Sequence, residues 1–138
     1  MKVITIAAVE HISYRLAKEM MEYNEPIPDF STRFPNALES CLLTPFQSFS
    51  KKDLYKGLVG KAAILFYLMV KNHPFQNGNK RIAVTTLLTF LYTNNKWLKI
   101  DHKELYNFTM WITESPSQFK DEAILAIKKF IRSHIVNV

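Results

Sequence analysis

The stretch His73-Pro74-Phe75-Gln76-Asn77-Gly78-Asn79-Lys80-Arg81 separates two long segments in which apolar residues recur at helical spacing. Before it, apolar residues recur every three or four positions over residues 50–71. After it, residues 79–94 are apolar over most of a helix circumference, which is typical of a helix buried on all sides. The pattern predicts two helices that meet at this stretch, with the second at the centre of an all-α fold.

The same periodicity predicts further helices on both sides of this pair. The expected helices cover residues 5–23, 36–43, 50–71, 79–94 and 101–113, and a last one begins at Ser115-Pro116. Residues 24–35 hold three prolines and form a loop long enough to have a function, and residues 97–100 form a short extended connector. We therefore expect a compact all-α fold of about six helices, in one domain over residues 1–138.

Local signals set the expected ends and buried faces of these helices. Ser50 followed by Asp53 is typical of an N-cap with an acidic residue in the first turn. Pro116 suits the first position of the last helix. The residues expected on inner faces are Ile6, Val9, Ile12, Leu16 and Met20 in the first helix, Leu54, Leu58, Ala62, Leu65 and Met69 in the third, and Ile124, Ile127 and Ile131 in the last.

Composition and charge limit the possible functions. The single cysteine, Cys41, excludes an internal disulfide and a cysteine-rich zinc site, and a buried thiol is expected there. The net charge of +6 favours an acidic partner such as a nucleotide, a nucleic acid or an acidic protein, although scattered lysines fit a solvated surface equally well. No apolar stretch approaches the ~20 residues that span a bilayer, and no signal peptide is recognisable. We expect a cytoplasmic protein that binds no membrane, with a nucleotide or a protein favoured over a nucleic acid as its partner.

Several residues of the opening stretch are suited to hold phosphate. The first turn of a helix exposes unpaired N–H groups and the positive end of the helix dipole, so it attracts anions. Gly78 allows the backbone to turn and to approach an anion closely, and Asn79 can cap the helix or donate from its amide. Arg81 offers a planar fork to two phosphate oxygens, and Lys80 adds a point charge.

His73 stands at the end of the preceding helix, where it can act as a base. An imidazole exchanges its proton near neutral pH, so it can accept the proton of an attacking hydroxyl. Pro74 keeps His73 out of helical geometry, and Phe75 is expected to anchor the loop in the core. Asn-Gly is also a common turn dipeptide, so the residues alone leave an ordinary polar turn as the alternative.

The stretch resembles the signature of the Fic/Doc family, H-x-F-x-[D/E]-[G/A]-N-[G/K]-R. The matching residues are His73, Phe75, Gly78, Asn79, Lys80 and Arg81, whereas Asn77 departs from the signature. The likeness continues in Ala37-Leu38-Glu39-Ser40, Pro45, Lys61-Ala62-Ala63 and Asn72-His73-Pro74-Phe75, and is closest to the death-on-curing (Doc) type toxins over roughly residues 34–138. The resemblance implies an all-α fold and transfer of part of a nucleoside triphosphate to a hydroxyl of a target protein.

The resemblance also implies roles for individual residues. His73 would be the general base, and Arg81 would be catalytic through the phosphates that it holds together with Gly78, Asn79 and Lys80. Residues 38–49 would form a flap that docks the target chain, with Leu38, Leu42, Leu43 and Thr44 as contacts. ATP or another nucleoside triphosphate would be the co-substrate, with Mg²⁺.

Two positions bear on which reaction the chain performs. Relatives that transfer AMP carry Gly at the position of Lys80 and a second Arg at that of Val84, whereas Asn-Lys-Arg without the second Arg resembles Doc. Doc toxins phosphorylate a threonine of elongation factor Tu and are neutralised by an antitoxin. AMP transfer is the alternative.

Asn77 stands where the family's acidic residue binds Mg²⁺, and an amide oxygen is only a neutral ligand. A binding module without turnover is therefore a further alternative.

Overall fold

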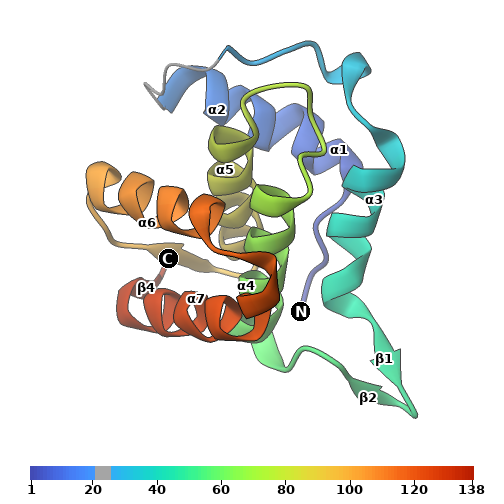
Figure 1. Cartoon of the computed structure of the whole chain (residues 1–138), viewed down its shortest axis with the longest axis vertical. Helices are drawn as coiled ribbons and strands as arrows, with labels where there is room; N and C mark the ends of the chain where they lie inside the picture. Colours follow the sequence, from blue (N-terminus) through green and yellow to red (C-terminus); the bar gives the residue numbers. More distant parts are fainter. Residues whose placement is uncertain (21–25) are drawn as a thin grey trace.

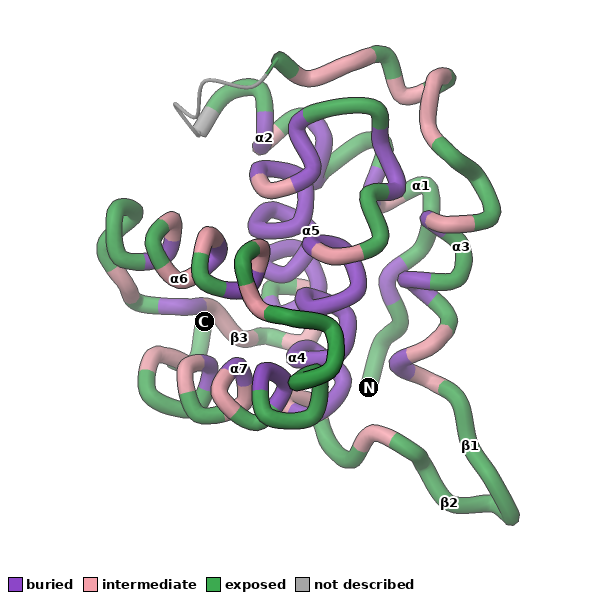
Figure 2. The backbone as a smooth tube through the Cα atoms, in the orientation of Figure 1, coloured by how far each residue is buried: buried purple, intermediate pink, exposed green. Residues whose placement is uncertain are grey.

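Two consecutive helices, α4 (Gly57–Lys71) and α5 (Asn79–Thr93), lie side by side at the centre of the computed structural model, which describes residues 1–20 and 26–138 (Figure 1). Residues 60–70 of α4 are all buried, and α5 is buried from Asn79 to Leu91 except at Lys80 (Figure 2). The prediction of a central buried helix that begins at Asn79 is confirmed.

The remaining elements surround this pair. Helix α2 and the π-helical turn before it pack on α5, α1 contacts α3, α3 packs on α4, α6 contacts both central helices, and α7 lies along α4. Their bounds are α1 Ile6–Ala8, a π-helical turn Val9–Ser13, α2 Tyr14–Met20, α3 Pro35–Leu43, α6 His102–Glu114 and α7 Lys120–His134, with 3₁₀ turns at Phe30–Thr32, Thr44–Phe46 and Ser117–Phe119. When α1, the π-turn and α2 are counted as one helix, the described residues form six helices, as predicted.

The helix predicted over residues 50–71 begins later than its N-cap signal indicated. Ser48–Phe49 (β1) and Lys52–Asp53 (β2) form an antiparallel hairpin, and both residues of its turn, Ser50 and Lys51, have positive φ. Asp53 does not cap a helix. Its carboxylate instead accepts a 2.9 Å hydrogen bond from the buried ammonium group of Lys61, which also donates to the carbonyl oxygen of Tyr55. The prediction that Leu54 is buried is wrong, since its side chain is 53% exposed.

The buried face of the first helix also differs from the prediction. Ile6 and Ile12 are exposed and Leu16 is half-buried, whereas Ser13, Tyr14 and Ala17 are buried together with Val9. The π-helical turn Val9–Ser13 changes the register after it, because one extra residue in a turn rotates every following side chain about the axis, whereas Ile6 lies before this turn. The buried Ser13 hydroxyl donates to the hydroxyl of Thr89 on α5 at 3.0 Å. The predicted helix end at residues 21–23 lies outside the described residues.

Two features near the C-terminus were not predicted. The expected extended connector at 97–100 overlaps β3 (Lys96–Leu98), but its antiparallel pairing with β4 (Ile135–Asn137) was not predicted. Pro116 precedes a 3₁₀ turn rather than the first turn of α7, which begins at Lys120. The predicted inner face of the last helix is confirmed, because Ile124, Ile127 and Ile131 are buried.

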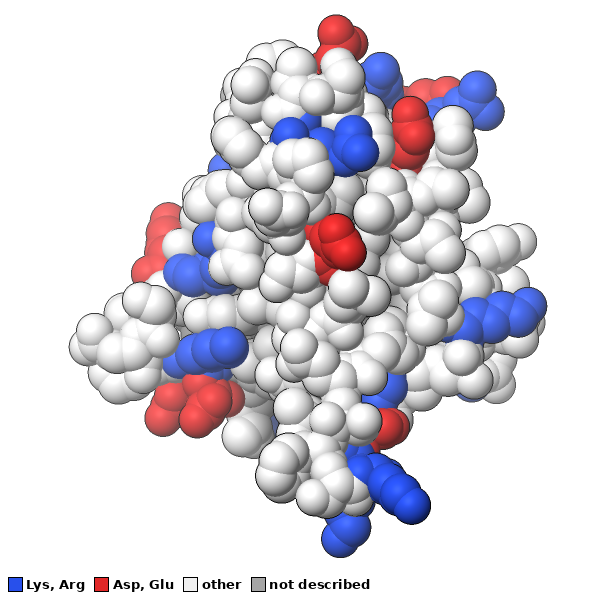
Figure 3. All heavy atoms as spheres, turned by 90° about the vertical axis from the view of Figure 1, so that its right-hand side faces the viewer, with Lys and Arg blue, Asp and Glu red and all other residues white. Residues whose placement is uncertain are grey.

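The surface shows no long-range separation of charge on the face that carries α3 and the hairpin. In Figure 3, lysine and arginine side chains on this face are interspersed with aspartate and glutamate. This supports the interpretation of the scattered lysines as a solvated surface. No helix within residues 1–20 and 26–138 is long and apolar enough to cross a bilayer.

Cys41 is buried as predicted. Its thiol should make the stability of the folded protein depend on pH in the alkaline range. Burial, opposed by a hydrogen bond from Asn72, raises the pKa of its thiol from 9.0 to about 11. The unfolded chain therefore loses the thiol proton at lower pH than the folded chain does. The free energy of unfolding should fall between about pH 9 and pH 11, with roughly 2–3 kcal/mol of the decline due to Cys41.

Denaturant unfolding across this pH range checks the effect. The Cys41→Ala variant should show a shallower decline than the wild-type protein. Burial, together with the nearby carboxylate of Asp29, also raises the pKa of Tyr14 from 10.0 to about 12, so both proteins should lose further stability between about pH 10 and pH 12. Equal slopes for the two proteins between pH 9 and 11 would contradict the assignment to Cys41.

Candidate active site

The loop between α4 and α5 is fixed at both ends by unusual backbone conformations. His73 follows the C-cap residue Asn72 and has φ of 46°, in the left-handed region. Gly78 is the N-cap of α5 with φ of 70°, also left-handed. Between them, Pro74 and Phe75 are buried whereas His73 and Asn77 are exposed. His73 is thus exposed at the start of the loop that leads into α5.

Phe75 anchors the loop, as predicted. Its side chain is 1% exposed and lies among aromatic rings, with centroid distances of 5.4 Å to Tyr14 and 6.1 Å to Phe30. The Tyr14 hydroxyl donates a 2.6 Å hydrogen bond to the carbonyl oxygen of Pro28. The ring cluster therefore joins α2, the segment after it and the motif loop.

Asn79 binds the loop back onto the first turn of α5. Its amide oxygen accepts a 3.0 Å hydrogen bond from the N–H of Phe75, and its amide nitrogen donates at 2.8 Å to the carbonyl oxygen of the same residue. Asn79 is 8% exposed. The side chain thus holds His73, two residues before Phe75, at a set position relative to the N-terminus of α5.

The two cations of the stretch differ in surroundings. Arg81 is 8% exposed, and its guanidinium group donates to the carbonyl oxygen of Ala17 on α2. Lys80 is half-buried. Arg81 therefore stabilises the packing of α2 on α5 from within the first turn of α5, and any phosphate that it holds must share the guanidinium with this contact.

Residues 26–34 lie across the motif loop. The N–H of Phe34 donates to the carbonyl oxygen of Pro74 at 2.8 Å. A Cβ on Gly78 would lie 2.8 Å from the side chain of Ile27 and 3.0 Å from the carbonyl oxygen of Pro26. The loop that the prolines predicted therefore forms one wall of the region around the motif.

Comparison with known proteins identifies the family. The model of the Fic/DOC family matches residues 4–91, which is more than half of the chain and includes the whole motif. The chain belongs to the Fic/DOC family. Proteins of this family transfer nucleotide-derived groups from nucleoside triphosphates to proteins. Neither the search of curated proteins nor that of solved structures found a match.

Sequence reasoning missed two contributions to the Fic/DOC site. The segment 26–34 was predicted as a functional loop, but its contact with the motif depends on tertiary packing. Lys71, the last residue of α4, donates to carbonyl oxygens at the end of α6, at 2.6 Å to Ser115 and at 3.3 and 3.4 Å to Thr113 and Ile112. This contact fixes the end of α4 immediately before His73, and no sequence pattern indicated it.

The proposed flap residues are in two different environments. Leu38 and Leu42 are buried in the core at 0% and 4% exposure, so in this structure their side chains cannot contact a target protein. Leu43 is 59% exposed, and the hydroxyl of Thr44 donates to the carbonyl oxygen of Ser40. The hairpin β1–β2 projects near the start of α4, whereas the motif lies at its end (Figure 1).

Asn77 is the residue expected at a Mg²⁺ position. Its amide oxygen accepts a 2.9 Å hydrogen bond from the N–H of Gly78, and the residue is exposed. Within the described residues, no group of three or more His, Cys, Asp or Glu side chains could hold a metal ion. Asn77 could offer one neutral oxygen to a Mg²⁺ ion, whose other ligands would have to come from a bound nucleoside triphosphate and water.

Replacing Gly78 with alanine should destabilise the protein by about 2 kcal/mol or more. An L-residue in the left-handed region costs roughly 1–2 kcal/mol, and the new Cβ must also displace Ile27 and the Pro26 carbonyl. Gly57→Ala is a matched control, because Gly57 has φ of 69° with nothing within 4 Å of an added Cβ. Thermal unfolding should show the larger loss for Gly78→Ala, and equal losses would contradict the close approach of residues 26–27.

Proposed function

We propose that this Fic/DOC protein transfers the γ-phosphate of a nucleoside triphosphate, with ATP as the first candidate, to a serine or threonine hydroxyl of a target protein. The observation that carries the proposal is the start of α5, where the left-handed Gly78 precedes Asn79-Lys80-Arg81 and the exposed His73 is bound to the same turn through Phe75 and Asn79. A helix N-terminus of this kind is suited to hold phosphate oxygens.

In the proposed reaction, His73 acts as the general base. The target hydroxyl oxygen attacks the γ-phosphorus, the bond from that phosphorus to the bridging oxygen of the nucleoside diphosphate breaks, and the hydroxyl proton passes to the imidazole. The N–H groups at the start of α5, with Lys80 and Arg81, stabilise the negative charge on the phosphate oxygens. Asn79 positions the loop that carries His73. Mg²⁺ bound to the triphosphate would neutralise part of its charge.

The environment of Val84 favours phosphate transfer over AMP transfer. Relatives that transfer AMP carry a second Arg at this position, where it holds the triphosphate. Here Val84 is fully buried and faces an apolar cavity lined by Leu88, Ile100 and Leu105. The position therefore offers no second cation to a nucleotide, which supports the Doc-like orientation.

A binding module without turnover is the second candidate, because Asn77 lacks the charge of the acidic residue at this position in the family. Its amide oxygen is also engaged by the N–H of Gly78. Asn77→Asp separates the two candidates. If the wild-type chain is an enzyme, this substitution should raise its activity, whereas a binding module that lacks further catalytic groups should modify no protein in either form.

We further propose a toxin role in the Doc manner, with a translation factor such as elongation factor Tu as the target and an antitoxin protein as the partner. The support is the Asn-Lys-Arg motif without a second Arg. Induced expression should halt growth, and His73→Asn should remove the effect. Harmless expression of an active wild-type protein would contradict the toxin role.

Label transfer tests the proposed reaction directly. The protein is incubated with a cell lysate, Mg²⁺ and ATP labelled at the γ or the α position. Label on a protein from γ-labelled ATP alone is the expected result. Label from the α position would reject phosphate transfer and establish AMP transfer, and transfer from neither by both the wild-type and the Asn77→Asp chains would favour the binding module.

A further inference from the structure

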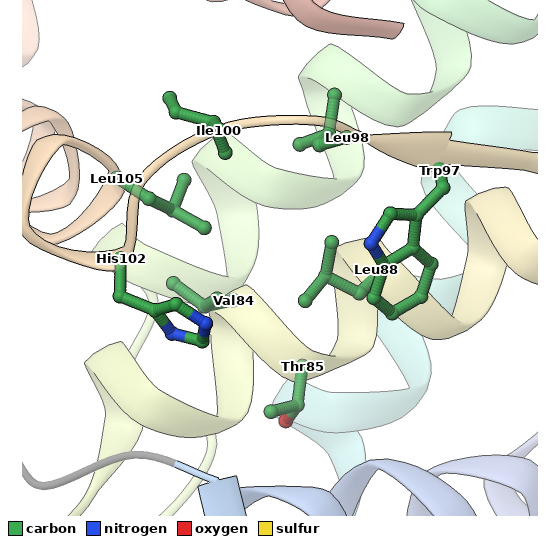
Figure 4. A pocket seen from close by; sticks show the side chains of 8 residues that line it. All are labelled: Val84, Thr85, Leu88, Trp97, Leu98, Ile100, His102 and Leu105. Atoms are coloured by element: carbon green, nitrogen blue, oxygen red, sulfur yellow. The ribbon is translucent and has the colours of Figure 1, made fainter. Parts of the chain in front are cut away.

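A small cavity of about 120 Å³ lies between α5, β3 and the start of α6 (Figure 4). Most of its lining is aliphatic or aromatic. The lining residues are Val84, Thr85, Leu88, Trp97, Leu98, Ile100, His102 and Leu105. An apolar cavity of about 150 Å³ in another protein stays dry and binds benzene. The present cavity is therefore of the right size for one six-membered ring.

Few polar groups face this cavity. The hydroxyl of Thr85 is used within α5, where it donates to the carbonyl oxygens of Arg81 or Ile82 at 3.1 and 3.2 Å. In Figure 4, the indole nitrogen of Trp97 is turned toward the other lining side chains, and the ring of His102 points toward Val84. The indole N–H can only donate, whereas a neutral imidazole can donate or accept.

The cavity is accessible from one side. Val84, Leu98 and Leu105 on its walls are buried, but Trp97 and Ile100 are half-buried and His102 is exposed. Of the three lining residues that are not buried, Trp97 and His102 carry polar groups and Ile100 does not. A ligand that fits this arrangement has an apolar ring and one hydroxyl group on its outer edge.

We propose that this cavity is a binding site for one small aromatic alcohol of the size of phenol. The ring fills the space between Val84, Leu98 and Leu105, and the hydroxyl accepts a hydrogen bond from the indole of Trp97 or exchanges one with the imidazole of His102. This site shares no residue with the motif stretch 73–81, but it includes Val84, the position that bears on the choice between phosphate and AMP transfer.

Phenol is the probe, and Trp97 is the reporter. In the Trp111→Phe background Trp97 is the only tryptophan, so its fluorescence reports occupancy of the cavity. Phenol should give a saturable change and bind about fivefold more tightly than benzene, which lacks the hydroxyl. Cyclohexane derivatives with bulky substituents should not compete. No saturable change with phenol in the folded protein would overturn the proposal.

Two substitutions test whether phenol binds within the cavity. Leu105→Phe should abolish phenol binding by filling the space, whereas Leu125→Phe, the same change at a 55% exposed position of α7, should leave it unaltered. If Leu105→Phe does not fold, the changes in amide and side-chain NMR shifts that phenol causes in the wild-type protein show where phenol binds. Shifts concentrated at Trp97, His102 and Val84 support the site, and shifts concentrated elsewhere overturn it.

Discussion

Replacing His73 should lower the rate of phosphate transfer by roughly a hundred- to ten-thousandfold, the range typical of a lost general base. The binding of ATP should change little, because the phosphates are assigned to the start of α5 rather than to the imidazole. Transfer from γ-labelled ATP to the target protein measures the rate, and a nucleotide titration measures binding.

The backbone conformation at residue 73 determines which substitution of His73 is the better test. His73 has φ of 46°, a conformation that asparagine adopts more readily than alanine. His73→Asn should therefore keep the stability of the loop and remove the base, whereas His73→Ala should also lose roughly 1 kcal/mol of stability. An unchanged transfer rate in His73→Asn would refute the assignment of the base.

Replacing Val84 with arginine should destabilise the protein by about 3 kcal/mol or more and should not create AMP transfer. The side chain at this position is fully buried and faces apolar walls, so the guanidinium group would lose its hydration without gaining a partner. Denaturant unfolding gives the loss of stability, and α-labelled ATP reports AMP transfer.

Val84→Met is the control for this prediction. Methionine is long and flexible but uncharged, and the adjacent cavity of about 120 Å³ can accept the extra atoms. Its cost should be under about 1.5 kcal/mol. A Val84→Arg protein as stable as Val84→Met, with label transferred from the α position, would contradict both the buried position of Val84 and the preference for phosphate transfer.

The sequence predicted the elements whose signals are local. The polar stretch 73–81 between two apolar segments predicted the helix start at Asn79 and the burial of Phe75, because turn residues and periodicity act over a few positions. The register of the first helix was not predictable in this way. Its π-helical turn is accompanied by a hydrogen bond from Ser13 to Thr89, a residue 76 positions away.

The hairpin β1–β2 is another element that local sequence signals did not predict. Ser50 and Asp53 fit a capping pattern, but the same residues also fit a tight turn and an ion pair, and the contact with the buried Lys61 selects the second arrangement. The surroundings of the motif depend in the same way on distant packing. No local sequence pattern predicts the contact of residues 26–34 with Gly78. The same holds for the hydrogen bonds from Lys71 to carbonyl oxygens at the end of α6.

Nucleotide binding observed by NMR tests the central claim most directly, namely that a triphosphate is held where α5 begins, beside His73. On titration with Mg²⁺ and ATP, the amide signals of Gly78, Asn79, Lys80 and Arg81 and the ring signals of His73 should shift together with one saturation curve. Shifts confined to the surface groove that His11 of the π-helical turn lines together with Arg15 and Lys18 of α2, with the motif signals unchanged, would contradict the claim.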